Sequence, residues 1–172
     1  MSDFLMPLRS LFELVDTFPS SIALRESQYM WAYITVAHVM AMCLFAGTVV
    51  MMDLRLLGVG NMHTTFSETQ RRLFPWQMVG MILAVITGLV LVFAQPLKFY
   101  ANVFFWVKMM MIVLAGVNAW AFHNISYLTV ASWDAGGTPP FGAKLAGAAG
   151  VALWGMVILA GRLIPYGETW FR

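Results

Sequence analysis

Of the three histidines in this chain, His38 occupies the position that most suggests chemistry. It lies inside the run Met30–Met52, which contains no Asp, Glu, Lys or Arg. Ionisable side chains are rare at bilayer depth, and where they occur they tend to bind, relay or coordinate something. Neutral imidazole is a common ligand of metals and of haem iron. His38 is therefore a candidate ligand, and the alternative is a ring hydrogen-bonded to a neighbouring helix.

The other histidines lie nearer the ends of apolar segments. His123 ends the third apolar run and is the second candidate ligand, whereas His63 lies in a polar stretch and is expected to be a loop residue. Two histidines on facing helices could hold a b-type haem. At 1.5 Å per residue, however, His38 lies roughly 4 Å from the middle of its run and His123 roughly 15 Å from the middle of its own, on the opposite side. One haem therefore requires a shifted third helix or another ligand, and three methionines near the depth of His38 are candidates: Met81, Met111 and Met156.

Two further polar residues interrupt the third run. Lys108 either extends its stem to the interface or faces the bundle, where its ammonium would meet an anionic group. Asn118 is expected to hydrogen-bond across helices.

The junction after the first run, Asp53-Leu-Arg-Leu-Leu-Gly58, is the most distinctive string. Asp53 and Arg55 stand where the first helix leaves the membrane, near the pair Arg71-Arg72 before the second. One interpretation is an ion-pair cluster that fixes helix ends. The other is an anion clamp for haem propionates, quinone oxygens or lipid phosphates, because the arginine fork binds pairs of oxygens well.

Helices must position these groups, because four apolar runs make up most of the chain. Each run approaches the roughly 20 residues needed to cross a bilayer. Pro75 fits the first turn of the second helix, and the third run could extend to Ser132. The fold class is therefore an all-α, transmembrane four-helix bundle in the domain 29–172, with both ends on one side of the membrane. The expected spans are 29–52, 75–94, 103–122 and 144–164.

Residues 1–28 form a separate amphipathic N-terminal segment. Apolar residues recur at helical spacing from Phe4 to Phe18, with charged residues between them. This pattern favours a surface helix that lies on the membrane or a partner, or one that packs on the bundle.

Composition narrows the class of protein. Of 172 residues, 60% are hydrophobic and only 10% charged, which excludes an ordinary soluble core. The net charge of +2, without a basic block, argues against nucleic-acid binding. The single cysteine, Cys43, excludes an internal disulfide, and no Cys-x-x-Cys-His or nucleotide-binding motif occurs. An electron-transfer subunit is thus favoured over a catalyst acting on its own.

The string His38…Asp53-Leu-Arg-Leu-Leu-Gly58…Phe105-Trp-Val-Lys108…His123 resembles a group of uncharacterised bacterial four-helix membrane proteins with a DLRLLG motif. That group in turn resembles the membrane domains of copper-resistance D-type proteins and small b-type cytochromes. The resemblance covers about residues 30–125. It implies a multi-pass protein of the bacterial inner membrane, with haem or copper at His38 and His123.

These features predict a membrane-embedded electron-transfer subunit that binds haem b. Its alternatives are a copper-handling membrane protein and a non-redox structural subunit of a membrane complex. Either role implies the lipid bilayer and partners: other membrane or redox subunits, a quinone, or a second copy paired through the small-residue faces of the fourth run. The predicted cofactor-binding residues are His38, His123, Arg55 and Lys108, of which the two histidines are the metal ligands.

Overall fold

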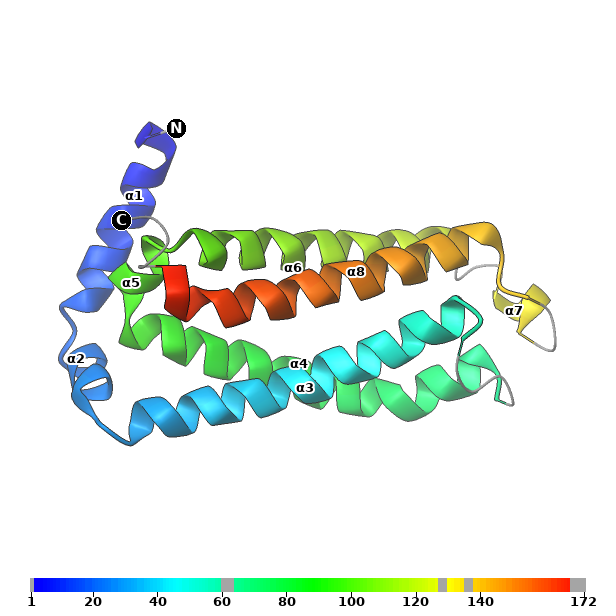
Figure 1. The fold of residues 1–172 in the computed structure, drawn as a ribbon, viewed down its shortest axis with the longest axis horizontal. Coiled ribbons are helices and arrows are strands. Elements are labelled where there is room, and N and C mark those ends of the chain that lie inside the picture. Colours follow the sequence, from blue (N-terminus) through cyan, green and yellow to red (C-terminus); the bar gives the residue numbers. More distant parts are fainter. Residues whose placement is uncertain (1, 60–63, 127–129, 135–137, 168–172) are drawn as a thin grey trace.

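The computed structural model describes residues 2–59, 64–126, 130–134 and 138–167, and every regular element in this part of the chain is a helix (Figure 1). Four long helices, with short extensions, are each long and apolar enough to cross a membrane. The protein is therefore a multi-pass membrane protein, and the predicted fold class is confirmed. The four helices are α3 (Met30–Leu56), α4 (Phe66–Ala94), α6 (Val103–Ala121) and α8 (Phe141–Leu163).

The long helices run up and down in a bundle (Figure 1). We call side A the end where α3 and α6 begin, and side B the end where they finish. α3 packs mainly on α4, α6 packs on α8, and α3 also crosses α8. α8 is the central helix, since Val157 and Ala143 are fully buried on it. Large apolar side chains face outward, including Leu89 and Trp120, which are 66% and 67% exposed in the isolated chain. Lipid is the environment that suits such a surface.

Three short helices cover side A, and α1 runs across the end of the bundle rather than along it (Figure 1). The predicted amphipathic helix is confirmed, and it packs on the bundle through Phe12, whose ring lies 5.4 Å from that of Tyr100. Pro19 begins the second helix after a break at Phe18. The short elements are α1 (Ser2–Asp16), α2 (Pro19–Glu26) and α5 (Pro96–Tyr100).

The second span begins earlier than predicted, at Phe66 rather than at Pro75. Thr65 caps the helix by accepting a hydrogen bond from the Glu68 amide at 3.2 Å. Asp134, from the loop before α8, accepts further hydrogen bonds from the first amides of α4. The prediction was wrong because the charged segment before Pro75 was interpreted as a loop, whereas it forms a polar helical turn and leaves the proline inside the helix.

The third span continues past α6 through a π-helical turn, η1 (Phe122–Ser126). Its predicted extension to Ser132 passes through residues 127–129, which lie outside the described residues; the separate turn α7 comprises Val130–Trp133. An apolar cluster closes side B beneath these turns. Its buried members are Met52, Leu56, Phe66, Val130, Trp133 and Ala143.

Candidate functional site

The His38 ring on α3 lies against α4, where it contacts two consecutive residues. Its Nδ1 atom is 2.9 Å from the hydroxyl of Thr87. A Cβ atom added to Gly88 would come within 3.1 Å of the ring carbon Cε1, closer than most real contacts. Gly88 therefore lets the imidazole approach the backbone of α4, and Thr87 fixes its orientation.

The hydrogen bonds of Thr87 determine which nitrogen of His38 carries the proton. The Thr87 hydroxyl donates to the carbonyl of Leu83 at 2.6 Å. A hydroxyl has one proton to donate, so Thr87 accepts from Nδ1–H of His38. The Nε2 atom then carries the lone pair. This is the arrangement of metal-ligating histidines, in which a hydrogen bond at one nitrogen fixes the other for coordination.

Lys108 of α6 occupies the neighbouring part of the bundle and lies over Gly161 of α8. A Cβ atom added to Gly161 would be 3.6 Å from the Lys108 ammonium nitrogen and 3.7 Å from its Cδ atom. The side chain thus faces α8 in the interior of the bundle. Neither side chain forms an ion pair with an acidic residue in the described part of the chain.

These groups lie at similar depth below side A. At 1.5 Å per residue, His38 is roughly 12 Å from the start of α3, Thr87 roughly 10 Å from the end of α4, and Lys108 roughly 8 Å from the start of α6. All three side chains are partly buried and belong to helices that are long and apolar enough to cross a membrane. His38 and Lys108, both predicted cofactor-binding residues, therefore lie at a similar depth, and Thr87 contacts His38.

His123 lies elsewhere. It is exposed on the π-helical turn at side B, 15 residues beyond Lys108 along the same span, or roughly 22 Å. The two histidines thus do not share one site. His63 lies outside the described residues.

The three methionines predicted as partners of His38 differ in how far they are buried. Met111, one turn deeper than Lys108, packs against the central cluster around Trp154 and Val157, as does Met42 below His38. The other two candidates have more exposed side chains: Met81 is 36% exposed and Met156 is 45% exposed. Of the three predicted thioether partners, Met111 is the one that the bundle interior offers.

The Asp53–Gly58 junction, which includes the last turn of α3, is arranged differently from the predicted cluster. Arg55 is only 8% exposed and donates from Nη2 to the carbonyl of Thr64 at 2.9 Å, which ties down the loop before α4. Asp53 is 9% exposed and lies against Gly150 of α8, and its Oδ2 atom is buried with no hydrogen-bond partner among the described residues. Arg71 and Arg72 bind Glu68 instead, each at 2.7 Å.

The residues of α4 that contact His38 were not predicted from the sequence. Thr87 and Gly88 form a polar and a small position on α4, seven and six residues before its end. His38 is eight residues after the start of α3. Matching depths in antiparallel neighbours would have paired them, but only with the correct choice of neighbouring helix and face.

The residues at this level could supply one ligand to a haem iron but do not form a complete metal site among the described residues. His38 supplies one oriented nitrogen and Lys108 a cation suited to a carboxylate. Across the described ranges, no three His, Cys, Asp or Glu side chains gather where they could hold a metal ion. A metal at this level would therefore depend on His38 together with a thioether or an external ligand.

Comparisons with known proteins give a family but not an activity. No curated protein and no solved structure matches the chain. Residues 14–167 match a family described as a family of unknown function, DUF6644, which covers both the His38 level and the side-B junction. The chain belongs to this family.

Proposed function

We propose that this protein is a membrane-embedded electron-transfer subunit that binds a b-type haem, with His38 as an axial ligand. The observation that supports the proposal most is the hydrogen bond between His38 Nδ1 and Thr87, because it leaves Nε2 with its lone pair inside an apolar bundle. A bound haem would supply one-electron redox chemistry.

The other residues at this level would have supporting roles. Lys108 would neutralise a propionate, because a cation facing the bundle is otherwise costly at membrane depth. Gly88 and Gly161 would let the His38 ring and the Lys108 side chain lie close to the backbones of α4 and α8. Met111 is the second iron ligand that we propose, whereas His123 stays a predicted metal ligand and Arg55 a predicted cofactor-binding residue, both near side B.

The proposal includes a setting. A haem-binding membrane subunit passes electrons between other redox partners, so we propose that it works in a bacterial inner-membrane complex with redox subunits or a quinone. Self-association through the exposed face of α8 is the simplest form of such an assembly. Gly155 belongs to this face, and a side chain added there would meet no atom within 4 Å in the monomer.

The test is a reduced-minus-oxidised spectrum of the purified protein, with haem extraction to give its stoichiometry. We expect haem b bands in the wild type, their loss in His38→Ala, and their retention in His123→Ala, which removes an imidazole at the far end of the same bundle. Size-exclusion profiles of both variants control for folding.

Other outcomes decide between the alternatives. Well-folded protein without haem bands overturns the proposal. Copper in the same preparation, lost in His38→Ala and Met111→Leu, would support the copper-handling alternative, because imidazole and thioether suit Cu(I). Neither haem nor copper would favour a structural subunit.

A further inference from the structure

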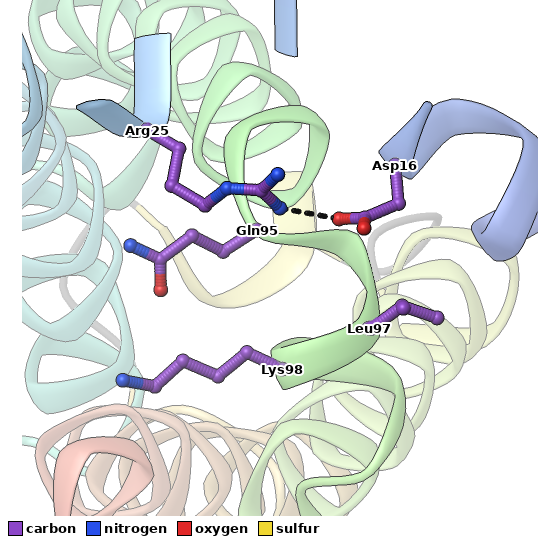
Figure 2. Close-up of a pocket in the computed structure, with 5 residues that line it drawn as sticks. All are labelled: Asp16, Arg25, Gln95, Leu97 and Lys98. Carbon is purple, nitrogen blue, oxygen red and sulfur yellow. Dashed lines mark hydrogen bonds and ion pairs between the residues drawn. The ribbon is translucent and has the colours of Figure 1, made fainter. Parts of the chain in front are cut away.

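A polar cavity lies at side A, between the N-terminal helices and the end of α4. Its volume is about 360 Å³, and its lining residues come from α1, α2 and the turn that joins α4 to α5 (Figure 2). The lining consists of Asp16, Arg25, Gln95, Leu97 and Lys98. Because α1 crosses the end of the bundle (Figure 1), the cavity lies at the side-A end of the long helices.

The charges on the cavity lining favour an anion. Two basic residues, Arg25 and Lys98, line the cavity together with one acidic residue, Asp16. Asp16 engages the Nη1 atom of Arg25 at 2.5 Å. That contact is made by one terminal nitrogen of the guanidinium and holds the group in place (Figure 2). Gln95 lies between the two basic side chains and adds amide donors (Figure 2).

An apolar groove of about 370 Å³ adjoins the cavity on its membrane side. It is lined by α1 and by the last turns of α4, and it contains almost no polar surface. The two sites meet at consecutive residues, since Val15 and Pro96 line the groove while Asp16 and Gln95 line the cavity. The groove residues include Leu11, Phe12, Val15, Leu89, Phe93 and Pro96.

We propose that this paired cavity and groove bind an anionic phospholipid of the phosphatidylglycerol type. Its phosphate lies between Arg25 and Lys98, and one acyl chain lies along the groove under α1. Arginine and amide donors suit the oxygens of a phosphodiester. The groove continues from the cavity towards the membrane. The acyl chain of a lipid can occupy this groove, whereas a free phosphate ion has no apolar part to bind there. This site is independent of His38 and of any haem.

The first test measures lipid binding to the full chain by native mass measurement after mild detergent extraction, with phosphatidylglycerol and phosphatidylcholine of identical acyl chains. We expect a preference for phosphatidylglycerol. Interfacial basic residues contribute about 1 kcal/mol each towards anionic lipid, so we expect Arg25→Gln and Lys98→Gln to weaken this binding about five-fold each and about 25-fold together.

Arg9→Gln is the matched control. Arg9 also lies on α1 and is also paired with an acidic residue, Glu13 at 2.8 Å, but it does not line the cavity. It should retain wild-type binding. Equal binding of the two lipids, or an equal loss in Arg9→Gln, overturns the proposal. Glycerol phosphate should not compete at concentrations where the lipid does; effective competition would show a simple anion site instead.

A second measurement does not depend on the variants folding. Phosphatidylglycerol with a photoactivatable group in its acyl chain is incorporated into membranes that contain the wild-type protein. We expect adducts on the peptides that carry Leu11–Val15 and Leu89–Phe93. Adducts spread evenly over the lipid-facing surfaces of α6 and α8 would overturn the groove assignment.

Discussion

The two ends of α8 meet their neighbours in opposite ways. At side B, a Cβ atom added to Gly147 would lie 2.6 Å from the backbone oxygen of Asp53 and 3.0 Å from the Leu56 Cβ atom. At side A, a Cβ atom added to Gly161 would be no closer than 3.6 Å to Lys108, an ordinary contact with the end of a flexible side chain. Backbones therefore touch at side B, whereas a side chain lies between helices at side A.

Buried polar groups follow the same division. Asp53 and Arg55 at side B are nearly inaccessible, and Arg55 serves the loop backbone. His38 and Lys108 at side A are partly accessible and lie at similar depth on different helices. The comparison indicates that side B is organised for stability, and that side A provides the room and the ionisable groups that binding requires.

The largest predicted effect is at the glycine crossing of side B. Gly147→Ala should lower the free energy of unfolding by about 3 kcal/mol, the upper part of the range for overpacking, because the clash is with backbone that cannot rotate away. Gly161→Ala, on the same helix, should change it by less than about 0.5 kcal/mol. Both are measured by unfolding in mixed detergent and SDS. Similar effects for the two variants would remove the contrast between the ends of α8.

The next effect concerns Arg55, which the sequence predicts either to fix helix ends or to bind an anion. Arg55→Met removes the hydrogen bond to Thr64 and leaves a buried carbonyl, so we expect a loss of about 1–3 kcal/mol in the free energy of unfolding. Arg72→Met, whose side chain is 70% exposed, should leave the unfolding midpoint unchanged. An Arg55 variant with unchanged stability but reduced binding of a cofactor would instead support the anion-clamp interpretation.

Helix number, helix type and up-down order could be predicted from the sequence, because they depend on long apolar runs. The start of α4 could not, because the bonds that extend it come from Thr65 and from Asp134, which is distant in the chain. Asn118 was correctly predicted to bond across helices, and it donates to the Ala146 carbonyl. The partner of His38 could not be predicted, because hydropathy gives depth but not the rotation of one helix against the next.

At side A, the hydroxyl of Thr87 is predicted to matter more for chemistry than for stability. Thr87→Val removes one hydrogen bond, so the free energy of unfolding should fall by about 1 kcal/mol. If His38 binds haem, the midpoint potential should shift as well, since the Nδ1 hydrogen bond tunes the basicity of the ligand. Thr87→Ser keeps the hydroxyl and should restore the potential. A Val variant with the wild-type potential would separate Thr87 from the redox site.

Apart from the control variants, the smallest predicted effect is at Asn118, which lies near the side-B end of α6. Its Nδ2 atom donates to the backbone carbonyl of Ala146 on α8 at 2.9 Å. Interhelical hydrogen bonds in membranes average only about 0.6 kcal/mol, because the separated helices find other partners, so Asn118→Leu should lower the free energy of unfolding by about that amount.

Asn102 makes a suitable comparison, because it stands at the start of α6. It caps that helix through two backbone amides and also donates to the carbonyl of Ile164. Asn102→Ala should therefore cost about 1–2 kcal/mol, more than Asn118→Leu, since it loses a helix cap as well as an interhelical bond. The reverse order would mean that the side-B end of the α6–α8 contact contributes more to the pairing of these two helices than the side-A end does. The position of Lys108 would then depend more on the contact at Asn118 than on the helix cap at Asn102.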